Sequence, residues 1–199
     1  MSEPKTRFIL ASASPRRTEI LTTLGLDFDV RVPDVDERQL PGESPQQYVM
    51  RAAVAKVRAV VNGYRAGVVI GADTVVVIDG QPLGKPGDAA DAKRMLRALG
   101  GRWHAVMTGV AVQRIETGDE AVDFEKTLVR FRDLADEEIE AYIATGEPVD
   151  KAGAYAIQGR GMLFVTEIAG NYQNVVGLPV PLLDRLVRQI GANLRSGEE

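Results

Sequence analysis

The chain has 199 residues, of which 45% are hydrophobic and 26% charged, and its formal net charge is −4. This composition is ordinary for a globular protein, and the length is enough for one domain of fair size or two small lobes. The acidic balance argues against general nucleic-acid binding, which needs a broad basic surface. The lack of cysteine and the single histidine exclude disulfides, thiolate catalysis and cysteine-ligated zinc, and they disfavour a serine–histidine triad.

The polar N-terminal residues and the hydropathy of the chain favour a protein that does not bind or cross a membrane. Residues 1–6 are polar, and no stretch has the length of a signal-peptide core or of a membrane span. We therefore expect a cytoplasmic protein. Because the sequence contains no repeat and no long linker, it predicts a single domain over residues 1–199, with residues 194–199 as a flexible tail.

The first chemical motif follows a predicted strand at Phe8–Ala11 and opens a predicted helix. Ser14 is a favourable N-cap, because its hydroxyl can accept from a helix N–H, and Pro15 suits the first helical position. Two arginines in a first turn oppose the positive end of the helix dipole unless an anion binds there. Two interpretations stay open. One is a capped surface helix with solvated arginines, and the other is a phosphate cradle formed by Ser12, Ser14, Arg16 and Arg17.

After a short predicted strand, an acidic loop spans residues 33–43. Its carboxylates, Glu37 among them, are either solvated or ligands of a hard cation such as Mg²⁺. Ser44 begins the next helix with a predicted capping box that Gln47 completes. Lys56 lies on the apolar face of that helix, where its ammonium either extends to solvent or meets an anion. We favour the anion.

The most apolar segment, residues 67–78, is rich in β-branched residues and is predicted to be a buried strand or strand pair. Asp73 lies in its middle, where a carboxylate must be paired, bind a metal or have a perturbed pKa. Gly71 and Ala72 leave room for a ligand beside the backbone. The alternative is a structural aspartate that bonds a neighbouring loop, and we favour the functional interpretation.

A tight turn at Asp79–Gly80 and a helix over residues 88–99 follow. Alternating segments at 103–114 and 122–132 predict a long hairpin, which we interpret as a candidate separate lobe. His104 lies at the start of the first of these strands. A lone histidine in a strand is usually structural, so we assign it no catalytic role.

Two later segments pair a cation with small residues: Lys85 in the loop 84–86, and Lys151 in the glycine-rich stretch 148–161. The stretch is either an ordinary loop with turn glycines or a loop that faces a ligand. In the second case Lys151 supplies charge and Gln158 contacts a base edge, since an amide offers the donors and the acceptor that suit a pyrimidine imide.

The remaining elements are predicted from periodicity and turn residues. A short acidic helix is expected at 136–145, a strand at 162–168, a turn-rich segment at 170–179 and a terminal helix at 181–193.

Eight segments occur in one order over nearly the whole chain: ASASPRR at 11–17, DE at 36–37, AAVAK at 52–56, GADTVV at 71–76, GKP at 84–86, TGV at 108–110, GEPVDKAGAYAIQG at 146–159 and NVVGLP at 174–179. Each is weak alone, and together they are highly specific. In this combination the chain resembles the Maf family of nucleoside triphosphate pyrophosphatases.

The resemblance implies an α/β fold of the ITPase-like kind, with a mixed sheet, flanking helices and two lobes around a central cleft. It also implies cleavage of nucleotides between the α and β phosphates with a divalent cation, Mg²⁺ or Mn²⁺, and a homodimer. AGAYAIQG at 152–159 is similar to the branch that acts on dTTP and UTP rather than on 7-methyl-GTP. In that branch the aspartate of GADT, here Asp73, is taken as the catalytic base, and Arg16, Thr74 and Gln158 are linked to substrate choice.

Residues and resemblance together predict hydrolysis of dTTP or UTP to the monophosphate and pyrophosphate. Asp73 deprotonates the attacking water, Lys56 and Lys85 stabilise charge on the leaving pyrophosphate, and Glu37 is the expected metal ligand. The nucleotide is expected to contact Ser12, Ser14, Arg16, Arg17, Thr74, Lys151 and Gln158.

Two alternatives remain at this point. One is a nucleotide-binding regulator that does not hydrolyse, and the other is a pyrophosphatase for another modified nucleotide, such as 7-methyl-GTP. Asp73 argues against the regulator, because an unpaired carboxylate beside phosphates would repel them.

Overall fold

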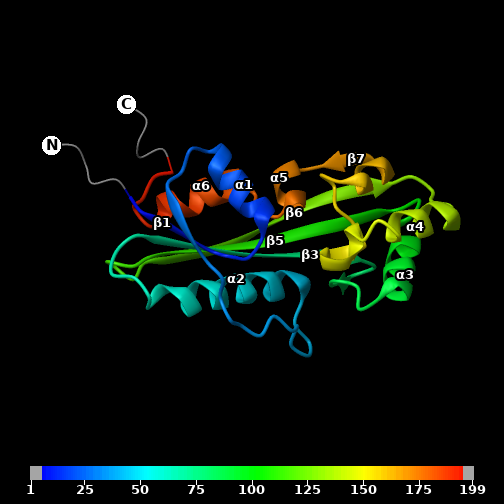
Figure 1. Ribbon diagram of the computed structural model, residues 1–199. Helices are drawn as coiled ribbons and strands as arrows, with labels where there is room; N and C mark the ends of the chain where they lie inside the picture. The colour runs from blue at the N-terminus through cyan, green and yellow to red at the C-terminus, as the bar shows by residue number, and fades with distance from the viewer. Residues whose placement is uncertain (1–5, 195–199) are drawn as a thin grey trace. The chain divides into compact units, whose positions relative to one another are not determined.

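A computed structural model describes residues 6–194 as an alternation of strands and helices (Figure 1). The strands are β1 (Phe8–Ala11), β2 (Phe28–Arg31), β3 (Val68–Ile78), β4 (Gln81–Leu83), β5 (Trp103–Arg114), β6 (Glu120–Phe131) and β7 (Val165–Ala169). The α-helices are α1 (Pro15–Thr23), α2 (Pro45–Val61), α3 (Ala89–Leu99), α4 (Asp136–Ile143), α5 (Tyr172–Val176) and α6 (Val180–Gln189). Three 3-10 helices are η1 (Glu147–Asp150), η2 (Ala152–Ala154) and η3 (Arg160–Phe164).

The strands form a mixed sheet in the order β2-β1-β3-β5-β6-β7, with β4 paired to β3. β1 runs parallel to both β2 and β3, whereas the β3–β4 and β6–β7 pairs are antiparallel. Parallel neighbours need a crossover connection, and α1 and α2 supply it on either side of β2. The predicted turn after β3 is confirmed: Asp79 and Gly80 adopt positive φ angles of 51° and 75°. The α/β class with a mixed sheet and flanking helices is confirmed.

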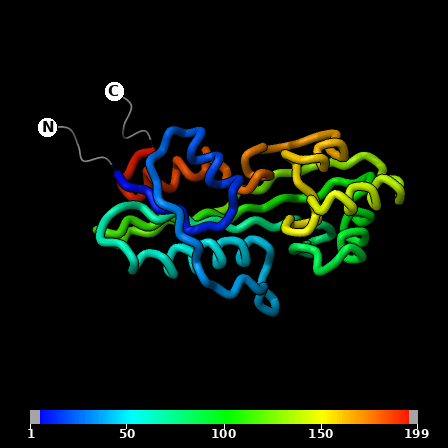
Figure 2. The backbone as a smooth tube through the Cα atoms, viewed as in Figure 1, coloured from blue at the N-terminus to red at the C-terminus, as the bar shows by residue number. Residues whose placement is uncertain are grey.

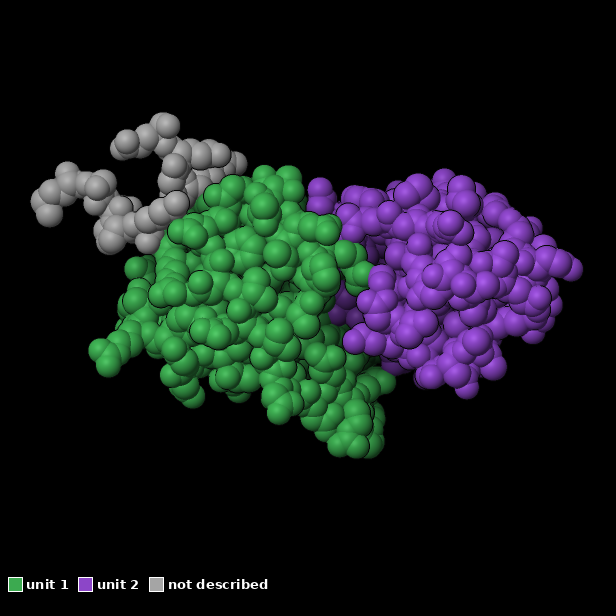
Figure 3. Space-filling model, in the orientation of Figure 1, with its two compact units in different colours: residues 1–73, 108–124, 177–199 green, residues 74–107, 125–176 purple. Residues whose placement is uncertain are grey.

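The chain divides into two compact units, coloured separately in Figure 3. In the described part, unit 1 comprises residues 6–73, 108–124 and 177–194, and unit 2 comprises residues 74–107 and 125–176. β3, β5 and β6 each contribute residues to both units. The hairpin of β5 and β6 is therefore not a lobe of its own, and that interpretation is wrong. The central cleft stays a prediction.

In unit 1 both faces of the sheet are covered by helices, because side chains alternate along each strand and point to opposite faces. Phe8 and Leu10 of β1 pack in a cluster with residues of α1 and α6, such as Leu21 and Leu183. Ile9 and Ala11 point to the other face and pack with α2, through residues that include Ala53 and Val57. Figure 1 shows α1 and α6 on one side of these strands and α2 on the other. The predicted capping box at the start of α2 is present: Gln47 N donates to Ser44 Oγ, and Ser44 N donates to Gln47 Oε1.

Unit 2 contains a cluster of aromatic rings around His104. The ring of His104 meets Phe131 edge-on at 4.9 Å between centroids, and its Nε2 lies 2.9 Å from the hydroxyl oxygen of Tyr155. Burial lowers the pKa of His104 to about 4, so the imidazole is neutral near pH 7. This is the structural role expected for a lone strand histidine.

Three C-terminal predictions differ from the structure. The predicted strand at 162–168 begins at Val165, because η3 occupies the preceding residues, and the predicted helix at 181–193 ends at Gln189. The segment expected to be turns contains α5, which Asn171 caps by accepting from Asn174 N through Oδ1 at 2.9 Å. The predicted tail lies, from residue 195 onward, outside the described residues.

Membrane insertion can be judged for residues 6–194, where no helix combines the length and the apolar composition that a bilayer crossing requires.

Candidate active site

The start of α1 holds a buried arginine rather than a solvated one. Ser12 Oγ accepts from Arg17 Nη1 and from Ser14 N, each at 3.1 Å, and Arg17 Nε donates to Gly177 O at 2.8 Å. The side chain of Arg17 is buried, as is Ser12. Of the two interpretations of this motif, the structure therefore excludes a helix whose arginines are both solvated.

Ser14 stands at the N-cap, as predicted, and Pro15 at the first helical position. The predicted capping hydrogen bond is wrong, however, because within the described residues the Ser14 hydroxyl accepts no N–H of the first turn. The backbone N–H of Ser14 is instead bound by Ser12. Ser14 therefore leaves the N-terminus of α1 without a hydrogen bond from its own side chain.

The charge of Arg17 lies within electrostatic reach of acidic groups from two other elements. Burial lowers the pKa of Arg17, Asp73 opposes that shift, Arg16 adds to it, and Glu37 again opposes it. The first-helix arginines and the two predicted acidic residues therefore belong to one electrostatic cluster within unit 1.

Lys56 is the centre of that cluster. From the buried face of α2, its Nζ donates to Asp73 Oδ1 at 2.6 Å and to Ala72 O at 3.2 Å, and it contacts Glu37 Oε1 at 2.8 Å. The Lys56 and Asp73 side chains are 7% and 9% exposed, whereas that of Glu37 is 45% exposed. The ammonium of Lys56 thus meets two carboxylates of the chain itself rather than solvent, and its contact with a ligand anion stays a prediction. The assumption that Asp73 is unpaired is wrong.

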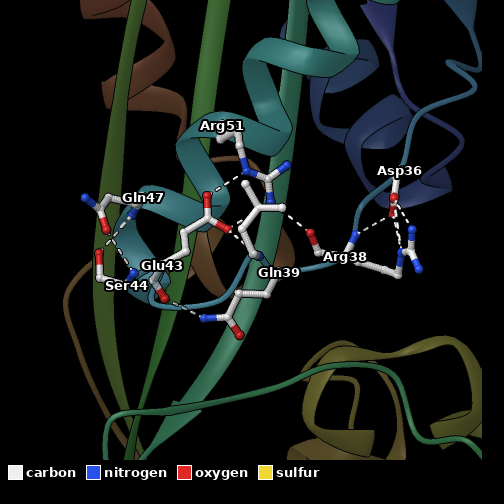
Figure 4. A network of polar contacts seen from close by, with 8 residues as sticks. Asp36, Arg38, Gln39, Glu43, Ser44, Gln47 and Arg51 are labelled. Atoms are coloured by element: carbon white, nitrogen blue, oxygen red, sulfur yellow. Dashed lines mark hydrogen bonds and ion pairs between the residues drawn. The ribbon is translucent and has the colours of Figure 1, made fainter.

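A network of polar contacts fixes the loop that carries Glu37 (Figure 4). Arg51 of α2 donates to both carboxylate oxygens of Glu43, at 2.6 and 2.9 Å, and to the carbonyl oxygen of Arg38 at 2.9 Å. The guanidinium of Arg38 in turn binds Asp36 and lowers the pKa of that carboxyl to about 2. Glu37 lies between Asp36 and Arg38, so the loop visible between β2 and α2 in Figure 2 has a defined course despite its lack of regular structure.

Tyr48 is a member of the cluster that the sequence alone did not reveal. Burial, and then the charges of Asp73 and Glu37, raise the pKa of Tyr48 to about 12. The available signal was spacing: Tyr48 precedes Lys56 by eight residues and therefore lies on the same face of α2. Its hydroxyl is a protonated donor near the two carboxylates at neutral pH.

The small residues before Asp73 serve helix packing and not ligand binding. A Cβ on Gly71 would lie 2.5 Å from Ala53 O and 2.8 Å from Val57 Cγ2, so only glycine lets α2 approach β3 this closely. Ala72 is fully buried in the core of unit 1. The interpretation that both residues leave room for a ligand is therefore wrong. The close approach of α2 at Gly71 brings Lys56 within reach of Asp73.

Unit 2 contains the other predicted site residues, Thr74, Lys85, Lys151 and Gln158. Gly153 N donates to Gly84 O at 3.0 Å, which brings the segments carrying Lys151 and Lys85 together. Lys85 and Gln158 are exposed, Thr74 is half-buried on β3, and Lys151 forms an ion pair with Asp150. These side chains form a second set, and Thr74 follows Asp73 directly in β3.

The carboxylates of Glu37 and Asp73 suit a hard divalent cation that takes its other ligands from substrate and water. Among residues 6–194, no group of three or more histidine, cysteine, aspartate or glutamate side chains could form a complete metal cage. Glu37 and Asp73 nevertheless direct one oxygen each at the same cationic group, Lys56 Nζ. Mg²⁺ is commonly bound by one or two carboxylates together with substrate phosphates and water, so these residues fit it.

Comparisons with known proteins identify the family of the chain. A family model described as "Maf-like protein" matches residues 7–190. A protein of Anaeromyxobacter dehalogenans named dTTP/UTP pyrophosphatase is 54% identical over 187 residues, which cover 93% of this chain and 94% of the relative. A protein of Symbiobacterium thermophilum with the same name is 49% identical over 191 residues, or 96% of this chain and 97% of the relative. The chain belongs to the Maf family.

Among solved structures, the Ham1 protein of Staphylococcus aureus matches with a TM-score of 0.53 over 92% of this chain and 99% of that one. Because the two sequences are only 14% identical, this likeness shows the fold alone. It supports the predicted fold class.

Proposed function

We propose that this protein is a nucleoside triphosphate pyrophosphatase that hydrolyses dTTP and UTP to the nucleoside monophosphate and pyrophosphate. The observation that carries the proposal is the buried Asp73–Lys56 pair, with Glu37 on the same ammonium, beside the N-terminus of α1. Within unit 1 it brings a carboxylate that can activate water close to cationic side chains that can bind phosphate. The names of the relatives from Anaeromyxobacter dehalogenans and Symbiobacterium thermophilum support the choice of substrate.

Asp73 acts as the general base in this proposal. Lys56 binds its Oδ1 and fixes the orientation of the carboxylate, so Oδ2 is the oxygen that receives the proton of the attacking water. Water then attacks the α phosphorus, and the bond from that phosphorus to the bridging oxygen of the β phosphate breaks, which releases pyrophosphate.

The cations and the helix terminus stabilise the negative charge that develops on the leaving group. Ser12, Ser14, Arg16 and Arg17 offer hydroxyl and guanidinium donors at the positive end of α1. In this proposal Lys85 and Lys151 add positive charge for the phosphates, and Thr74 and Gln158 contact the nucleoside. A glutamine amide can pair with the imide edge that thymine and uracil share.

We also propose that the enzyme uses Mg²⁺ or Mn²⁺, which Glu37 would hold together with the substrate. When bound, the cation neutralises phosphate charge and polarises the phosphorus that is attacked. We place the enzyme in the cytoplasm, where nucleoside triphosphates are made.

A regulator that binds nucleotide without hydrolysis remains the alternative. Since Lys56 neutralises Asp73, the carboxylate alone does not exclude such a protein. Turnover decides between them: pyrophosphate release from a panel of nucleoside triphosphates with Mg²⁺ should be fastest with dTTP and UTP. Binding without release of pyrophosphate from any of them would favour the regulator.

The variant Asp73→Asn tests the base assignment. Turnover should fall about 10²- to 10⁴-fold, the usual contribution of a general base, while nucleotide affinity changes little. Asp79→Asn is a matched control, because Asp79 lies just beyond the same strand, pairs with Arg102 and has a side chain 68% exposed. Near-normal activity of Asp73→Asn would remove Asp73 from this role.

A further inference from the structure

A tyrosine and a glutamate of unit 2 bind the backbone on both sides of Gln158. Glu147 Oε1 accepts from the Tyr142 hydroxyl at 2.7 Å and from Gly161 N at 3.1 Å, and its Oε2 accepts from Arg160 N at 2.9 Å. The Tyr142 hydroxyl oxygen also accepts from Ala156 N at 3.1 Å. The pair thus fixes the residues before and after the turn that carries Gln158.

The turn itself is closed by a hydrogen bond from Gly159 N to Ala156 O at 3.1 Å, which leaves the exposed Gln158 near its tip. Gly159 permits the close approach of the glutamate: a Cβ at this position would lie 2.4 Å from both carboxylate oxygens. Gly161 is equally restricted, since a Cβ there would lie 2.7 Å from Ala156 O and 3.0 Å from the Tyr142 hydroxyl. The two glycines let this turn wrap around the Tyr142–Glu147 pair.

We infer that Tyr142 and Glu147 are positioning residues for base selection, because they hold the Ala156–Gly159 turn in the one geometry that presents Gln158 to the nucleobase. This inference rests on the proposed function, in which Gln158 contacts the base. Neither side chain touches the substrate in this account. Both act through the backbone of the turn.

The protonation states of Tyr142 and Glu147 keep their hydrogen bonds to the backbone in place at neutral pH. Tyr142 is buried, and burial together with the Glu147 acceptor raises its pKa, so the hydroxyl stays a donor at neutral pH. Burial acts to raise the pKa of Glu147, but the N–H of Arg160, the Tyr142 hydroxyl and the N–H of Gly161 outweigh it and lower the value. An ionised acceptor with three donors is stronger and more directional than neutral turn contacts.

The test compares two tyrosines that each lose one hydroxyl. Tyr142→Phe removes the bonds to Glu147 and Ala156, whereas the control Tyr155→Phe removes the bond to His104 and, among the described residues, none to the Gln158 turn. For each variant, kcat and KM are measured with UTP, dTTP, CTP and GTP. We expect Tyr142→Phe to reduce the preference for UTP over GTP by about five- to tenfold, mainly through KM, as loss of one or two hydrogen bonds would. Tyr155→Phe should retain the wild-type ranking.

Hydrogen exchange supplies a readout that does not depend on turnover. The amides of Ala156, Arg160 and Gly161 should exchange about tenfold faster in Tyr142→Phe than in Tyr155→Phe. Glu147→Gln serves as a second variant if Tyr142→Phe does not fold, because the amide keeps the shape and loses the charge. It should produce the same shift in substrate preference.

Gln158→Glu tests base recognition by Gln158 separately from the positioning role of Tyr142 and Glu147. If this variant leaves the substrate ranking unchanged, base reading by Gln158 is wrong and the proposed function loses that part. If Gln158→Glu changes the ranking while Tyr142→Phe and Glu147→Gln do not, the positioning role is overturned and the proposed function stands.

Discussion

Replacement of Lys56 by methionine should destabilise the protein far more than loss of any surface cation. The substitution keeps the length of the apolar stem and removes the ammonium that contacts Asp73 at 2.6 Å, Glu37 at 2.8 Å and Ala72 O at 3.2 Å. Asp73, with its side chain only 9% exposed, then becomes a buried charge without its partner. Glu37 is half-exposed and can turn toward water, so the loss of its contact with Lys56 contributes little to the destabilisation.

Breaking a buried ion pair by removal of one partner typically costs about 3–5 kcal/mol. Glu37 relaxes and α2 remains in place, so we expect the lower end of that range, about 3 kcal/mol. The second variant, Asp73→Asn, removes the charge that Lys56→Met leaves unpaired. The double variant should therefore be more stable than the sum of the single effects predicts, with a coupling energy of about 2–3 kcal/mol.

The free energy of unfolding is measured by urea denaturation followed by circular dichroism at pH 7, for the wild type, both single variants and the double variant. Arg58→Met is the control on the same helix, because Arg58 is exposed and pairs with Glu120 at 3.3 Å. That change should cost less than about 1 kcal/mol. A buried Lys56–Asp73 ion pair is contradicted if Lys56→Met lowers the free energy of unfolding no more than Arg58→Met does, or if the effects of Lys56→Met and Asp73→Asn simply add.

Two further predictions follow from the fixed loop and from the buried histidine. Arg51→Met frees the backbone of Arg38 beside Glu37, so the Mg²⁺ concentration for half-maximal turnover and the dissociation constant for Mn²⁺ should both rise about three- to tenfold; equal values for Arg51→Met and Arg58→Met would contradict this. His104 has a pKa lowered from 6.5 to about 4, so the folded state resists protonation and stability is lost as pH falls between these values, by up to about 3 kcal/mol. In urea titrations His104→Phe should flatten this part of the pH profile, and an unchanged slope would count against it.

Residues close together in the sequence predicted helix starts and tight turns. Ser44 with Gln47 marked the start of α2, and Asp79–Gly80 marked the β3–β4 turn, because caps and tight turns depend on residues close in sequence. α5 was missed for a related reason. Its cap at Asn171 was readable, but glycine and proline nearby indicated turns, and a five-residue helix has little periodicity.

The candidate site was predictable in its residue types and not in its contacts. The sequence indicates that Lys56 is a costly buried cation, but its partners lie 17 and 19 residues away in the chain. The packing of α2 on β3 brings Asp73 close, and the course of the loop before α2 brings Glu37 close. Gly71 was misread for the same reason, since its missing side chain could admit either a ligand or a helix. The anchor of Arg17 on Gly177 spans 160 residues and has no local signal. The Tyr142–Glu147 pair depends likewise on how a loop folds back.

The central claim is hydrolysis at the α phosphorus with Asp73 as base, and one isotope experiment tests it most directly. UTP is hydrolysed with Mg²⁺ in ¹⁸O-labelled water, and the products are analysed by mass spectrometry for the wild type and Asp73→Asn. We expect one ¹⁸O atom in the UMP, unlabelled pyrophosphate, and about 10²- to 10⁴-fold less product from the variant within the same time. Label in the pyrophosphate, or release of UDP with orthophosphate, would contradict the mechanism.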